Sequence, residues 1–93
     1  MVVGIIRIKI RIAWSHSLKE KRKVVKSICA KVQSKFKVSI AEVDEQDTHQ
    51  IIVLGIAYVT NGNAHADSIA SNIVNFIEGN VEGDLIEIER EIV

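Results

Sequence analysis

The sequence predicts an α+β fold of the ferredoxin-like type, in which a four-stranded antiparallel sheet carries two helices on one face. Three observations predict it: strictly alternating segments near both ends of the chain, two segments of helical periodicity, and an apolar hairpin between them. In chain order these segments read strand, helix, strand, strand, helix, strand, which is the split βαβ arrangement. Because 93 residues, 47% of them apolar, suffice for one core, residues 1–93 are expected to form a single domain.

The N-terminal half contains one strand and one helix. Isoleucines alternate with basic residues from Ile6 to Ile12, which is the period of a half-buried strand. Ser17 and Glu20 have the spacing of a capping box, in which each side chain bonds a free backbone donor of the other. The apolar series that follows predicts a helix from about Leu18 to about Lys35.

The C-terminal half supplies the other three strands and the second helix. A hairpin is expected because two apolar runs flank a short polar turn. A helix follows the turn residues Asn61 to Asn63, and Gly79 stands where a left-handed C-terminal cap is expected. The expected elements are a strand at 38–43, a turn at 44–47, a strand at 48–60, a helix at 64–78 and a strand at 85–93.

Charge is divided between the two halves of the chain. Eleven of the twelve Lys and Arg residues lie in the first forty positions, and eleven of the twelve Asp and Glu residues lie after them. If the first and last strands are neighbours, the bases of one oppose the acids of the other and specify the register. The rows concerned are Arg7, Lys9 and Arg11 on the first strand, and Glu87, Glu89 and Glu91 on the last.

The first helix carries a cluster of cations that has no such partners in the sequence. Its N-terminal half contains one acid, Glu20, although cations in a first turn oppose the helix macrodipole by about 0.3 to 1 kcal/mol each. A placement that costs stability indicates a functional constraint, so we expect an anion-binding surface; a merely solvated basic face is the alternative. The expected nucleic-acid-binding residues are Lys19, Arg22, Lys23 and Lys26 on one stripe, Lys21 on the opposite flank, and Trp14 and His16 in the preceding loop.

Two roles stay open for Trp14 at this point. Its ring could stack on an unpaired base beside the helix, together with His16. It could equally cover the edge of the core.

Both faces of the third strand are apolar, although only one of them can meet the helices. The other face would remain exposed unless a partner covers it, and Val3 and Ile5 extend the exposed set. We therefore expect a homodimer through the open sheet face, with a central strand in a monomer as the alternative. The predicted interface residues are Ile52, Leu54, Ile56 and Tyr58.

Catalytic, metal and cofactor sites are not expected. Ser15, His16 and Ser17 are adjacent on a loop, where a nucleophile and a base seldom reach hydrogen-bond geometry. Glu42, Asp44, Asp47 and His49 could gather a divalent cation, but we expect a solvated acidic turn; contact with the basic helix of another subunit is a further alternative. Cys29, the single cysteine, occupies an apolar helix position that suits a packed thiol. With no long apolar run and no disulfide, the expected location is the cytoplasm, without membrane contact.

Two motifs resemble one known family. The run from Ser17 to Lys23, and the pair of segments from Ala41 to Asp47 and from Leu54 to Ala57, resemble the YlxP-like family of small bacterial proteins, a domain of unknown function designated DUF503. The resemblance covers essentially the whole chain and implies a ferredoxin-like sandwich. Because genes of the family commonly lie among translation-factor genes, it also implies a connection with RNA or the ribosome. This chain departs from the family by having Ala13 to His16 where members tend to carry Pro and Gly.

The function predicted from these observations is that of a non-enzymatic cytoplasmic protein, associated with translation, whose first helix contacts the phosphate backbone of RNA or the ribosome. The alternative is a module for protein–protein interaction that docks on an acidic protein surface without nucleic acid. The two hypotheses differ in what co-purifies with the protein: nucleic acid removed by nuclease, or a partner that resists it.

Overall fold

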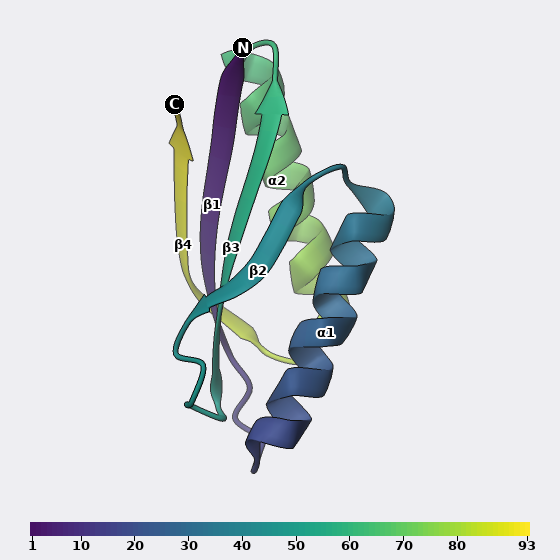
Figure 1. Ribbon diagram of the computed structural model, residues 1–93, viewed down its shortest axis with the longest axis vertical. Helices are drawn as coiled ribbons and strands as arrows, with labels where there is room; N and C mark the ends of the chain where they lie inside the picture. The colour runs from purple at the N-terminus through teal and green to yellow at the C-terminus, as the bar shows by residue number, and fades with distance from the viewer.

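Both helices cover the same face of a four-stranded antiparallel sheet (Figure 1). The computed structural model describes all residues from 1 to 93. Its elements are β1 (Val2–Arg11), α1 (Leu18–Lys35), β2 (Ser39–Asp44), β3 (Ile51–Thr60), α2 (Asn63–Asn80) and β4 (Asp84–Ile92). The strand order β2-β3-β1-β4 places the last strand beside the first. The ferredoxin-like fold predicted from the sequence is therefore confirmed.

The core lies between the sheet and the two helices. Residues directly opposite one another on paired strands share a face, and Ile6 of β1 is opposite Ile56 of β3, as Ile8 is opposite Leu54. The alternating isoleucines of β1 are fully buried, so their β3 partners also face the helices. The helices contribute Ile28 and Val32 from α1, and Ala66, Ala70, Ile73 and Ile77 from α2.

Helix α1 begins at Leu18 because its first turn is capped from the preceding loop. Ser17 Oγ accepts a hydrogen bond from the backbone N–H of Glu20 at 3.1 Å. The Glu20 carboxylate accepts in turn from the backbone N–H of His16 at 3.3 Å, one residue before the donor expected in a capping box. The loop and the first turn of α1 therefore hold each other in place.

Two local predictions were wrong. Gly79 lies inside α2, which continues to Asn80, and no glycine has a positive φ angle, so Gly79 is no left-handed cap. The hairpin connection runs from residue 45 to 50, longer than the predicted turn, because β3 begins at Ile51 and not at Thr48. Within this connection Glu45 adopts a left-handed conformation with φ of 55°.

Gly4 is required by a close approach on the inner face of the sheet. It pairs directly with Tyr58, whose ring lies across it, so that a Cβ at this position would fall 2.2 Å from the ring carbon Cζ. The ring is held there because Tyr58 Oη donates a hydrogen bond to the Ala66 carbonyl of α2 at 2.6 Å. This contact fastens α2 to the centre of the sheet. Neither helix is long and apolar enough to span a membrane.

Candidate nucleic-acid interface

A cluster of exposed cations lies on the solvent side of the N-terminal half of α1. Lys19, Arg22, Lys23 and Lys26, which we call the α1 cation cluster, are all exposed. They lie on the opposite side of the helix from the buried residues Ile28 and Val32. The structure thus brings together four of the five helix cations that the sequence predicted to act as one surface.

None of these four cations has an internal partner. The ion pairs of the molecule join Arg7 to Asp44, Lys21 to Glu42 and Arg90 to Asp67, and no carboxylate lies within 4.0 Å of the α1 cation cluster. The carboxylates of the C-terminal half of the chain therefore leave the positive charge on α1 unneutralised. This is the electrostatic feature that an anionic ligand would recognise.

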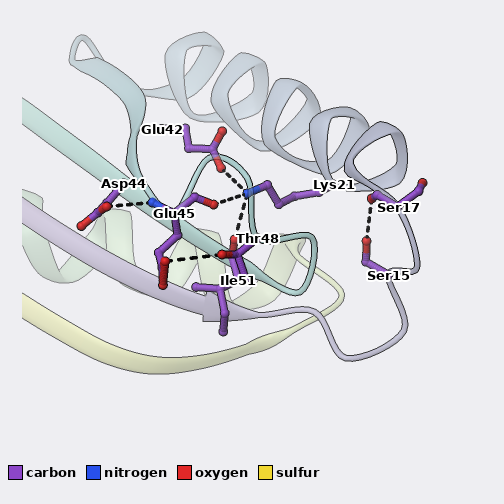
Figure 2. Close-up of polar contacts among 8 residues, drawn as sticks. All are labelled: Ser15, Ser17, Lys21, Glu42, Asp44, Glu45, Thr48 and Ile51. Atoms are coloured by element: carbon purple, nitrogen blue, oxygen red, sulfur yellow. Dashed lines mark hydrogen bonds and ion pairs between the residues drawn. The ribbon is translucent and has the colours of Figure 1, made fainter.

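Lys21 does not belong to this surface, and its predicted role in binding is wrong. Its side chain is completely buried, and its ammonium group contacts three oxygen atoms of the β2–β3 hairpin (Figure 2). Lys21 Nζ donates to the carbonyls of Glu45 at 2.6 Å and Ile51 at 3.1 Å, and it lies 2.9 Å from Glu42 Oε2. Two of the three ammonium protons are thus donated to backbone carbonyls, and the carboxylate of Glu42 balances the charge.

The ion pair between Lys21 and Glu42 is asymmetric. Glu42 Oε2 is buried and has no partner with hydrogen-bond geometry, so its 2.9 Å contact with Lys21 Nζ is a charge contact and its only compensation. We call Lys21, Glu42 and the carbonyls of Glu45 and Ile51 the Lys21 hub. It attaches α1 to the hairpin and lies apart from the exposed cations.

Two signals in the sequence could have identified the Lys21 hub. Lys21 lies seven residues before Ile28 and therefore on the same face of the helix as the buried residues. Glu42 alternates with Ile40, which places both on the inner face of β2, and they pair with Leu54 and Ile56. A buried carboxylate facing a buried helix lysine is the pattern that indicates an internal ion pair.

Trp14 lies next to the α1 cation cluster. Its indole Nε1 donates a hydrogen bond to the Glu82 carbonyl at 2.6 Å, and the residue is 42% exposed. The ring is therefore anchored to the segment between α2 and β4 and still presents surface to solvent. With Lys23 it lines a hollow between α1 and the connection from α2 to β4. His16 is exposed but does not line this hollow. Of the two predicted loop residues, only Trp14 therefore shares the hollow with Lys23.

The loop that presents Trp14 is tied to the β2–β3 hairpin. The side-chain amide of Gln50 donates to the carbonyls of Ala13 at 3.0 Å and Ser15 at 3.3 Å. Ser15 is fully buried and its hydroxyl donates to the carbonyl of Ser17 at 3.2 Å. These contacts join the loop to the hairpin and to the start of α1.

The open sheet face is not the one predicted from the sequence. Ile52, Leu54, Ile56 and Tyr58 are between 0% and 5% exposed and pack against the helices, so they cannot form a dimer interface. The alternation of β3 could not reveal which set faces outward, because both sets are apolar; the register with the isoleucines of β1 decides it. The outer face instead presents Ile5, Ala57 and Val59, with Val3 and Val93 beside them.

Charged rows flank this apolar strip, with one difference from the predicted pairing. Arg7 is opposite Glu89 and Lys9 is opposite Glu87, as expected for adjacent antiparallel strands. Glu91 is opposite Ile5, and Arg11 is opposite Asp84, so the third predicted pair does not form. Arg7 makes its ion pair with Asp44 at 3.1 Å, across β3, and not with the glutamate beside it.

Two side chains have shifted titration behaviour. Burial raises the pKa of the Cys29 thiol, and the negative charge of Glu42 raises it further. Burial also raises the pKa of Tyr58, which the nearby Arg90 lowers and Asp67 raises. Both shifts favour the neutral forms, which suits groups that serve packing.

Comparison with known proteins supports the relationship that the two motifs suggested. A family model described as "Protein of unknown function (DUF503)" matches residues 3–90. Over 76 residues the chain is 42% identical to "Uncharacterized protein YlxP" of Bacillus subtilis (strain 168), covering 82% of this chain and 77% of that protein. A de novo designed protein with a ferredoxin fold, solved by solution NMR, has a TM-score of 0.61 over 99% of this chain and 85% of its own. At 18% identity, that likeness concerns the fold alone.

Proposed function

We propose that this chain, which belongs to the DUF503 family of proteins of unknown function, binds the phosphate backbone of RNA through the α1 cation cluster. The observation that carries the proposal is that Lys19, Arg22, Lys23 and Lys26 are exposed and have no carboxylate within 4.0 Å. Cations that are free of internal partners can replace the counterions condensed on a nucleic acid.

The position of these cations strengthens the proposal. Lys19 lies in the first turn of α1, where positive charge opposes the helix macrodipole, and Lys23 lies one turn later, where the two cations repel each other. Stability alone would favour an acid at position 19. Lys21, in contrast, is paired internally, so the cations in this segment divide between a structural one and a set available to a ligand.

RNA is favoured over an acidic protein surface by the side chain next to the cations. Trp14 presents 42% of its surface beside Lys23, and an exposed aromatic ring next to positive charge suits a base attached to a phosphate. We propose a binding role without catalysis, in the cytoplasm. Ribosomal RNA is the first candidate ligand, given the link to translation that the family resemblance implies.

The proposal is tested by measuring the affinity of the full chain for a labelled single-stranded RNA at several salt concentrations. If the four cations each neutralise a phosphate, the logarithm of the affinity should fall by about 3 units per tenfold rise in salt, at about 0.7 per contact. The double variant Lys19→Glu, Lys23→Glu should abolish binding. Lys37→Glu is the charge control for the single variant Lys23→Glu, because both change the net charge equally and Lys37 is also exposed but lies beyond the end of α1.

Unchanged affinity in the double variant, with the fold intact by circular dichroism, would overturn the proposal. So would equal losses in Lys23→Glu and in Lys37→Glu, since net charge and not the helix surface would then control binding. Purification from cells distinguishes the alternative function: a partner that remains after nuclease treatment, with no absorbance at 260 nm, supports docking on an acidic protein.

We also propose that two copies of the chain associate through the outer face of the sheet. Val59 is 65% exposed there and Ile5 is 38% exposed, and adjacent strands carry a row of bases and a row of acids. A second copy packed face to face over this strip would remove Val59 and Ile5 from water. Light scattering should give twice the chain mass, and Val59→Lys should give the monomer mass; a monomeric wild type excludes the dimer.

A further inference from the structure

The hollow beside Trp14 has the composition of a site for a small planar group. It has a volume of about 250 Å³ and lies between the first half of α1 and the segment that leads from α2 into β4. This is below the range of about 300 to 1,000 Å³ typical of sites for drug-sized ligands, so it suits one ring system. Its apolar lining is Trp14, Val24, Ile28 and Val81, and its polar lining is Lys23, Ser27, Asn80 and Glu82.

Trp14 is held as a rigid wall of this hollow. Its Nε1 is bonded to the Glu82 carbonyl at 2.6 Å, which fixes the ring against the segment after α2. Because the loop behind it is held by Gln50, the ring need not be ordered when a ligand arrives. A preorganised aromatic surface binds a flat ligand with little loss of conformational entropy.

Two of the polar residues that line the hollow, Asn80 and Glu82, carry acceptor groups. Asn80 donates its side-chain amide to the Phe76 carbonyl at 2.8 Å, which orients the amide and leaves its oxygen Oδ1 as the group without a partner. Glu82 also lines the hollow, and its carbonyl accepts the hydrogen bond of Trp14 Nε1. Acceptors of this kind match the exocyclic amino groups of adenine and cytosine, which uracil lacks.

Cations continue from the hollow along the same side of α1. Lys23 lies at its rim, and a second, shallower depression between the helices is lined by Lys31, Lys35 and Phe76. Residues 23 to 35 of an α-helix span about 18 Å at 1.5 Å per residue. A backbone that leaves the hollow can therefore follow a line of lysines, without meeting a carboxylate in that depression.

We propose that this hollow receives one unpaired base of a single-stranded RNA, stacked on Trp14 and preferring a base with an exocyclic amino group. The inference rests on the proposed function and makes it more specific, because a base pocket beside the cations selects single strands over duplexes. In a duplex the bases are stacked on each other and cannot enter the hollow.

Trp14 is the only tryptophan in the chain, so its fluorescence reports directly on the proposed contact. The wild-type protein is titrated with adenosine and uridine, and separately with a hexamer of adenylate, the same hexamer with abasic sites, and a duplex. Binding of the oligonucleotides is followed independently by anisotropy of a terminal label. Trp14→Leu removes the aromatic surface at a partly exposed position, and Asn80→Leu removes the acceptor Oδ1.

The expected results are quenching of Trp14 by adenosine more than by uridine, and tighter binding of the hexamer than of the duplex. Loss of one stacked base should weaken hexamer binding about 5- to 150-fold, whether through Trp14→Leu or through the abasic sites. Asn80→Leu should reduce the preference for adenosine over uridine. This last result separates recognition from stability, since the ratio of two affinities of one variant does not depend on how much of it is folded.

Four outcomes can be distinguished. Hexamer binding with quenching that requires the base supports the inference. Hexamer binding without any change in Trp14 emission overturns it and leaves the proposed function standing. Quenching by adenosine without oligonucleotide binding overturns the proposed function and supports a pocket for a free base. No response to either kind of probe overturns both.

Discussion

The Lys21 hub should make a larger contribution to stability than any cation on the surface of α1. Lys21→Met keeps an unbranched side chain of similar length but removes the charge and all three contacts, leaving Glu42 Oε2 buried without its only partner. Removing one partner of a buried ion pair costs about 3 to 5 kcal/mol. We expect the lower end of this range, about 3 kcal/mol, because the Glu42 side chain retains 15% exposure and can recover some hydration.

A loss of about 3 kcal/mol would be a large share of the total free energy of unfolding. A chain of 93 residues is expected to unfold with a free energy of about 5 to 14 kcal/mol, and each kcal/mol lost lowers Tm by about 4 to 8 °C. Lys21→Met should thus lower Tm by about 12 °C or more, as measured by circular dichroism. Urea titration at 25 °C gives the free energy of unfolding directly.

Two variants make the experiment decisive. Lys23→Met is the same chemical change two residues away on the exposed side of α1, and it should alter stability by no more than about 0.5 kcal/mol. The double variant Lys21→Met, Glu42→Leu should recover at least half of the loss, because it removes the stranded carboxylate as well. The reasoning is refuted if Lys21→Met costs less than about 1 kcal/mol, or if the second substitution adds its own full cost.

Four further outcomes are expected. Lys19→Glu should raise the free energy of unfolding by about 0.3 to 1 kcal/mol, as urea titration would show, because a carboxylate in the first turn complements the macrodipole; it should weaken RNA binding at the same time. Gly4→Ala should destabilise by about 1 to 3 kcal/mol in the same assay, because its Cβ would overlap the fixed ring of Tyr58. Since the pKa of Tyr58 is raised on folding, its contribution to stability is complete below about pH 10 and is lost as pH rises above that value, a loss that should be absent from Tyr58→Phe. The raised pKa of Cys29 should make the native thiol react with iodoacetamide at pH 8 more slowly than the same thiol in urea, as mass spectrometry would show.

The order of elements could be predicted from the sequence because local and global patterns agree. The isoleucines of β1 alternate without interruption, and Ser17 and Glu20 mark the start of α1, so neither element depends on distant contacts for its identification. The same reasoning placed Lys19, Arg22, Lys23 and Lys26 on the exposed side of one helix.

The wrong predictions concerned features that depend on contacts between segments, which the sequence of a single segment does not reveal. Tyr58 and its neighbours at alternate positions could face either side until the register with Ile6 was known, because both faces of β3 are apolar. Lys21 was misplaced because a lysine suggests exposure, whereas its position relative to Ile28 indicates burial. The length of the β2–β3 connection was also mispredicted. Lys21 binds the carbonyls of Glu45 and Ile51, at the two ends of this connection, and the sequence of the hairpin alone does not reveal that contact.

The Lys21 hub gives a physical reason why the two sequence motifs that resemble the family occur in the same chain. Lys21 belongs to the segment from Ser17 to Lys23, and Glu42 and Glu45 belong to the segment from Ala41 to Asp47, so the hub is the contact between the two. By engaging the one buried cation of α1, the hairpin fixes the rotation of the helix about its axis. The remaining cations are thereby turned to solvent, and a structural ion pair determines which face of α1 is available to a polyanion.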